Sequence, residues 1–240
     1  MAKFTTLETK LAPFLAQCDD VLDGTYCAVL FGSGARNEWV EGRSNVNVLL
    51  VLDDAQPGTL QRLGRAFRTF ADFSSEPPLL LSRAEWREAG DAFPLEITDM
   101  RIAYTVLRGD DPMSEVLPSH ADLRRALERE FRGKLLQLRR GFVARSDDEL
   151  ALGALAAGSV RTFVLLSRCT LVLLGEAVPA TSAGVVERAA ARLGFDKAPL
   201  ELALAKGAAS EWRCSVEDFV RYLAAVETAV RAVDQLPLEA

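Results

Sequence analysis

Residues 31–52, with the sequence FGSGARNEWVEGRSNVNVLLVL, restrict the folds open to this chain more than any other segment. The segment predicts the end of a strand, a Gly-Ser turn, a short helical or looped stretch, and then a second strand. Side chains two residues apart share one face of a strand, so Asn45 and Asn47 should point the same way. Val46 and Val48 should point into a core on the other face. The segment therefore predicts a glycine turn that lies beside two carboxamide side chains.

The chain up to about residue 118 alternates between strand-like and helix-like segments. Apolar runs bounded by turn residues predict strands over 26–31, 46–52, 78–81, 93–100 and 102–107. Helical spacing of apolar residues predicts helices over 5–18, 59–73 and 82–89. This mixed pattern predicts a small mixed-sheet domain over residues 1–118.

The remainder of the chain is helical almost throughout. Its first helix carries an apolar stripe formed by Leu123, Leu127, Phe131, Leu135, Leu138 and Phe142. Ser146 and Glu149 form a predicted capping box for the next helix. Further helices are expected over 182–193 and 215–236. The predicted fold class is thus α+β, with an all-α helical bundle over residues 119–240.

Composition excludes several classes of function. The net charge is −6 and the pI is near 5.0, so we expect neither nucleic acid nor a membrane surface as a partner. The four cysteines show no CxxC spacing and there is one histidine, which argues against a zinc site. The N-terminus lacks an apolar signal core, and the longest apolar segment, 163–174, is too short to span a bilayer. We expect a cytoplasmic protein.

The Gly-Ser turn and the basic residues of the second domain are candidate phosphate contacts. Glycine lets backbone N–H groups approach a phosphate, and a serine hydroxyl adds a donor. The nucleotide-binding candidates are Gly32, Ser33, Arg36, Ser44, Lys134 and Arg139. Two simpler interpretations remain open: a β-hairpin with two solvated asparagines, and a basic helix face of internal salt bridges such as Glu128–Arg132.

Residues 31–52 resemble the GS…SDxD signature of the nucleotidyltransferase superfamily, which has the DNA polymerase β type of fold. Gly32 and Ser33 match the GS pair, and residues 44–47, SNVN, stand in place of SDxD. FPLEITD (93–99), VLRGDDP (106–112) and EREFRGKLLQLR (128–139) resemble a group of poorly characterised bacterial proteins with a helical region after this domain. The resemblance covers about residues 25–145. It implies a fold, and for active members it implies nucleoside monophosphate transfer by two Mg²⁺ held by three carboxylates.

The family carboxylates are replaced in this chain by Asn45 and Asn47. Mg²⁺ prefers anionic oxygen ligands, and each lost charge at ~4 Å is worth about 4 kcal/mol at an effective dielectric of ~20. Asp53 and Asp54 cannot replace them, since a rise of ~3.3 Å per residue places them roughly 20 Å along the strand. Glu96 is the candidate third carboxylate and metal ligand, on a neighbouring strand, unless it is merely a solvated residue. Asp99 should lie on the opposite face of that strand.

Three functions fit these residues. The first is a nucleotidyltransferase fold with a degenerate metal site that acts by binding a nucleoside triphosphate or a partner. The second is an active nucleotidyltransferase that uses Glu96 and Mg²⁺ to modify a small-molecule or protein hydroxyl. The third is an interaction protein with an empty cleft, whose helical domain binds a protein partner or forms a homodimer.

Overall fold

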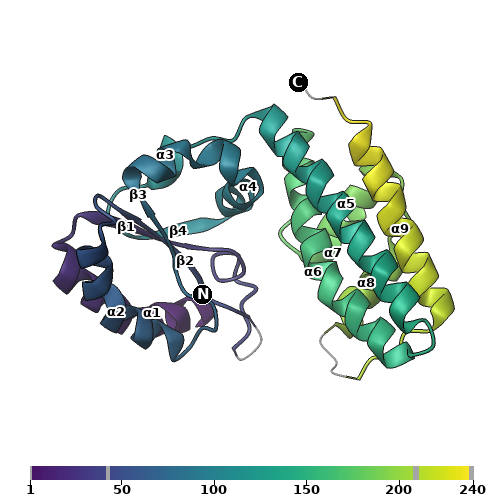
Figure 1. The fold of residues 1–240 in the computed structure, drawn as a ribbon, viewed down its shortest axis with the longest axis horizontal. Coiled ribbons are helices and arrows are strands. Elements are labelled where there is room, and N and C mark those ends of the chain that lie inside the picture. The colour runs from purple at the N-terminus through teal and green to yellow at the C-terminus, as the bar shows by residue number, and fades with distance from the viewer. Residues whose placement is uncertain (1, 42–43, 208–210, 238–240) are drawn as a thin grey trace. The chain divides into compact units, whose positions relative to one another are not determined.

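The computed structural model describes residues 2–41, 44–207 and 211–237. The chain forms two compact units, Met1–Pro118 and Ser119–Ala240, and each is described here by itself. The first unit contains a four-stranded sheet flanked by helices, and the second contains helices packed as a bundle (Figure 1). The α+β class predicted from the sequence is confirmed.

The sheet of the first unit has the strand order β3-β2-β1-β4. Strand β1 is antiparallel to β2 and β4, while β3 is parallel to β2. The elements in chain order are α1 (Ala2–Leu22), β1 (Tyr26–Phe31), β2 (Asn47–Leu52), α2 (Pro57–Ala71), β3 (Leu79–Ser82), α3 (Arg83–Ala92), α4 (Pro94–Ile102), β4 (Tyr104–Arg108) and a short 3₁₀ helix (Pro112–Glu115).

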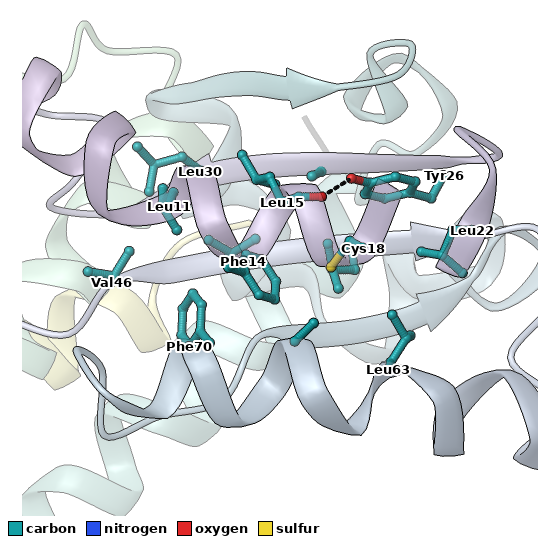
Figure 2. Packing of buried hydrophobic residues seen from close by; sticks show 14 of the residues in the cluster. Leu11, Phe14, Leu15, Cys18, Leu22, Tyr26, Leu30, Val46, Leu63 and Phe70 are labelled. Carbon is teal, nitrogen blue, oxygen red and sulfur yellow. Dashed lines mark hydrogen bonds between the residues drawn. The ribbon is translucent and has the colours of Figure 1, made fainter. Parts of the chain in front are cut away.

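Both faces of this sheet are covered, which explains why β1 and β2 are apolar along nearly their whole length. On one face the strands pack against α1 and α2, where the rings of Phe14 and Phe70 lie 5.0 Å apart (Figure 2). On the other face Leu49 and Val51 pack against Trp86 of α3 and neighbouring apolar residues. The alternation of β2 therefore assigns each of its apolar side chains to one of two cores.

The strand predicted over 93–100 is wrong, because this segment is helix α4, Pro94–Ile102. The alternation of Leu95 and Ile97 suggested a strand, but the buried positions also include the consecutive residues Thr98, Asp99 and Met100. Proline suits the first turn of a helix, where its missing N–H has no partner to lose, and it is unfavourable inside a sheet. The strand predicted over 102–107 is β4.

The second unit consists of five helices in its described part. They are α5 (His120–Arg145), α6 (Glu149–Leu173), α7 (Ser182–Leu193), α8 (Ala198–Lys206) and α9 (Val216–Asp234). Helix α6 is the centre of the bundle, because it packs against each of the other four. Length and composition alone would let α6 cross a membrane, but half of its most apolar stretch is buried inside the bundle. Its apolar character is accounted for by this central position.

The cap of α6 differs from the predicted capping box. Asp148 is the N-cap, and its carboxylate accepts the N–H groups of Leu150 and Ala151, both at 3.0 Å. Ser146 is instead the C-cap residue that follows Arg145 at the end of α5. A capping aspartate also carries negative charge at the positive end of the helix dipole, so it is the better cap at this position.

Candidate functional site

The turn after β1 is closed by its own backbone. Gly32 has a φ of +69° and Asn37 has a φ of +60°, so the chain reverses through two left-handed residues. The Arg36 N–H donates to the Gly32 carbonyl at 3.0 Å, and the Glu38 N–H donates to the Ser33 carbonyl at 2.9 Å. These bonds fix a compact loop at the end of a buried strand, which is a rigid base for a binding site.

Asn47 lies directly against this turn. It is the first residue of β2 and pairs with Phe31, the last residue of β1. A Cβ atom added to Gly32 would lie 2.7 Å from Asn47 Nδ2, so the carboxamide occupies the space that glycine leaves. Val46 and Val48 are buried on the opposite face, as the alternation predicted. The structure thus brings the glycine turn and the second asparagine together.

Asn45 and Ser44 precede β2 and have structural partners. Asn45 Oδ1 accepts the Ser75 hydroxyl at 2.7 Å. Ser44 Oγ accepts the Val40 N–H at 3.2 Å, while the Ser44 carbonyl accepts the Trp39 indole N–H at 3.0 Å. Ser44, predicted to bind nucleotide, therefore closes the loop that leads into β2. The adjacent residues 42 and 43 lie outside the described part of the chain.

Glu96 was predicted to lie on a strand beside β2. It lies instead on the exposed face of α4. It borders a cavity of about 250 Å³ whose other lining residues are apolar, among them Leu81, Trp86 and Met100. This environment offers Glu96 no second carboxylate with which to share a metal ion. The strand placement of Glu96 is therefore wrong, and its role as the third family carboxylate stays a prediction.

Asp99 is the carboxylate of α4 that contacts the glycine turn. It is buried, and its Oδ2 lies 3.3 Å from Arg36 Nη1, while Arg36 Nε lies 3.3 Å from Glu38 Oε2. The Arg36 side chain is only 13% exposed, so the pair is shielded from solvent. The predicted strand alternation placed Asp99 on the face opposite to Glu96, away from the site. Pro94 is typical of the first turn of a helix, and it could have indicated α4 and thus the position of Asp99.

No protein-family model matches the sequence, and no curated protein matches it either. The fold does match a solved structure, the spectinomycin adenyltransferase AAD(9) from Enterococcus faecialis, crystallised with ATP and spectinomycin. The TM-score is 0.56 over 93% of this chain and 99% of that chain, at 11% sequence identity. The chain has a nucleotidyltransferase fold. At this level of identity the likeness extends to the fold alone.

The residues of this nucleotidyltransferase fold do not suit two Mg²⁺ ions. In the described part of the chain, no group of three or more His, Cys, Asp or Glu residues could hold a metal ion. Amide oxygens at positions 45 and 47 supply no negative charge, and Asp99 is already paired with Arg36. No metal-dependent step can be assigned to these side chains.

The two basic residues of the second unit that were predicted to bind nucleotide have partners within that unit. Lys134 Nζ donates to Gln137 Oε1 at 3.0 Å, and Arg139 Nη2 lies 3.1 Å from Glu227 Oε1 on α9. The predicted Glu128–Arg132 pair is present at 3.0 Å. These contacts match the interpretation of a salt-bridged helix face, and the role of Lys134 and Arg139 in binding nucleotide stays a prediction.

Proposed function

We propose that this protein binds a nucleoside triphosphate at the Gly32–Ser33 turn without metal, and that it acts through that binding rather than through nucleotidyl transfer. The observation that carries the proposal is the carboxamide of Asn47, which packs against Gly32. An aspartate at this position would repel phosphate unless Mg²⁺ stood between them. An asparagine carries an N–H₂ donor instead, which can contact a phosphate oxygen directly.

The surrounding residues support an anion site of this kind. The left-handed Gly32 leaves room beside the turn for the Asn47 carboxamide, and Ser33 contributes a hydroxyl donor. Arg36 adds a positive charge beside the turn, where Asp99 and Glu38 hold its guanidinium group. The crystallised AAD(9) was solved with ATP, which is consistent with a nucleotide on this fold.

Calorimetry with ATP and GTP tests the proposal, first in EDTA and then with Mg²⁺ or Mn²⁺. We expect binding in EDTA and a dissociation constant that changes less than about threefold when the metal is added. Binding that requires metal, together with pyrophosphate release in a coupled assay, would instead establish an active nucleotidyltransferase acting on a small-molecule or protein hydroxyl. Absence of nucleotide binding under every condition would leave the interaction protein as the remaining function.

Restoring the family carboxylates provides the converse experiment. Asn45→Asp combined with Asn47→Asp should create measurable Mn²⁺ binding and should weaken ATP binding in EDTA at least about tenfold, because two anions would face the phosphates. Asn37→Asp is the matched control, since Asn37 is exposed on the same loop and aspartate tolerates its left-handed backbone. A double variant that binds no Mn²⁺ above the control would contradict the proposed position of these residues.

The cytoplasm is the proposed location. All four cysteines, Cys18, Cys27, Cys169 and Cys214, are free and buried, which is the usual state in a reducing compartment.

A further inference from the structure

The cavity of about 250 Å³ beside Glu96 lies within the first unit and is lined by residues of β3, α3 and α4. Trp86 and Ile97 form part of its wall and are each 1% exposed. Leu79 and Phe93 also line it and are 42% and 48% exposed, so the cavity reaches from the core to the surface. Protein interiors are closely packed and leave few spaces larger than a water molecule. A cavity of this size that opens to solvent is therefore a candidate ligand site.

Glu96 sets the charge of this cavity. Among the described residues that line it, Glu96 is the one charged residue and the others are apolar. The Trp86 indole N–H donates to the Pro112 carbonyl at 2.8 Å, so it is not available to a ligand. The Glu96 side chain forms no ion pair with another described residue. A negative ligand would be repelled by this carboxylate and would find no side-chain donor, whereas a positive ligand would gain a counter-charge.

The volume of the cavity limits the ligand to one ring and a short chain. An apolar cavity of roughly 150 Å³ holds a benzene molecule, so the larger cavity beside Glu96 has room for a ring with a few further atoms. Trp86 and Phe93 supply aromatic rings, against which another ring packs favourably. Glu96 is exposed, so a charged group beside it keeps part of its hydration while the ring is buried. The ligand that fits is apolar at one end and cationic at the other.

We propose that this cavity binds a small organic ammonium ion, with its apolar group among the side chains of β3, α3 and α4 and its nitrogen beside Glu96. The side chains that line the cavity do not include the proposed nucleotide contacts Gly32, Ser33 and Asn47. The two proposals therefore stand or fall separately.

Three compounds of similar size test the charge preference. Phenylethylammonium, phenylethanol and phenylpropionate each carry one ring and a short chain, which ends in a positive, a neutral and a negative group. Each is titrated into the isotope-labelled full chain, with backbone amide and indole chemical shifts as the readout. We expect the ammonium ion to bind with a dissociation constant of about 0.1–1 mM and to shift the signals of Leu81, Trp86 and Met100.

The order of the three affinities decides the chemical class. We expect the alcohol to bind about threefold more weakly than the ammonium ion and the carboxylate at least about tenfold more weakly, because an exposed ion pair contributes modestly while an anion is repelled. An ammonium ion that binds no more tightly than the alcohol would overturn the proposal. Unchanged signals of the cavity residues at about 10 mM ligand would overturn it as well.

A pair of charge variants assigns the effect to one carboxylate. Glu96→Gln should weaken binding of the ammonium ion about threefold and should leave binding of the alcohol unchanged. Glu88→Gln is the matched control, since Glu88 is exposed on α3 and does not line the cavity, and it should change neither affinity. Equal effects of the two variants would contradict the position of the nitrogen beside Glu96.

Filling the cavity gives a readout that does not depend on charge. Ala89 is buried and lines the cavity, so Ala89→Leu should occupy part of the space and weaken binding of both the ammonium ion and the alcohol at least about tenfold. A cooperative thermal transition shows that this variant is folded, and if it does not fold, the comparison of Glu96→Gln with Glu88→Gln still decides. A folded Ala89→Leu variant that binds like the wild type would place the ligand elsewhere and overturn the proposal.

Discussion

Gly32 is the residue at which backbone geometry and the candidate site meet. Gly32→Ala should lower the free energy of unfolding by about 2 kcal/mol, because alanine is strained at a φ of +69° and its Cβ would meet the Asn47 amide at 2.7 Å. Urea denaturation measures this change. Gly133→Ala is the control: it lies within α5 with nothing within 4 Å, so it should stabilise the protein by about 0.5–1 kcal/mol. Effects of the same sign would contradict the conformation described for the turn.

Asp99 and Glu96 lie one helical turn apart on α4 and should differ sharply. Asp99→Asn should destabilise the protein by about 1–3 kcal/mol, because the Arg36 guanidinium, which is largely shielded from solvent, loses one of its two counter-charges. Glu96→Gln should change stability by less than about 0.5 kcal/mol, since Glu96 is exposed and the substitution keeps its shape. Thermal unfolding of both variants measures the difference, and a larger effect at Glu96 would contradict the Arg36–Asp99 assignment.

The positions of Gly32 and Asn47 can be predicted from the sequence, whereas the position of Asp99 cannot. The contact between Gly32 and Asn47 followed from a local pattern, since turn chemistry and strand alternation act over a few residues. Asp99 could not be placed in this way, because its partner Arg36 is 63 positions away in the sequence. Because this segment was predicted to be a strand, Asp99 was placed on the face away from the site, and Glu96 became the candidate third carboxylate.

At the scale of single elements, the N-terminus of a helix is stabilised by the side chain that accepts hydrogen bonds from its free N–H groups. Asp148→Ala should lower the free energy of unfolding by about 1 kcal/mol, because its carboxylate accepts two N–H groups at the start of α6. Ser146→Ala should have an effect below about 0.5 kcal/mol, since Ser146 caps nothing at that start. Chemical denaturation of the two variants compares them, and the reverse order would restore the capping box predicted from sequence.

Elements with a strong periodic signal could be predicted, and those with a weak one could not. The buried strand β1 and the helix α7 lie where their apolar patterns and turn residues placed them. Helix α4 has nine residues, and alternation over so short a stretch does not separate helix from strand. The tertiary environment decides there, because one side of α4 closes the core over the sheet while the other is open to solvent.

At the scale of the whole molecule, the chain divides near residue 118 into two compact units, and each unit buries apolar residues of its own. The first unit contains the two clusters on either face of the sheet. The second contains its own aromatic contacts, with Phe163 of α6 lying 5.6 Å from Phe131 and 5.4 Å from Phe195. Composition and periodicity could indicate this division, whereas the AAD(9)-like arrangement of elements emerged only from the folded chain.

Because each unit is compact and buries apolar residues of its own, we expect each unit to fold without the other. Fragments 1–118 and 119–240, expressed separately, should each unfold cooperatively in urea, since each buries apolar surface within its own boundaries. The sum of their far-ultraviolet circular dichroism spectra should match that of the full chain. A fragment 1–115, which removes Val116 from the core beside α3, is the control and should be less stable than 1–118. If either complete unit lacks a cooperative transition, its core must be completed by residues of the other unit, and the division at residue 118 marks no folding boundary.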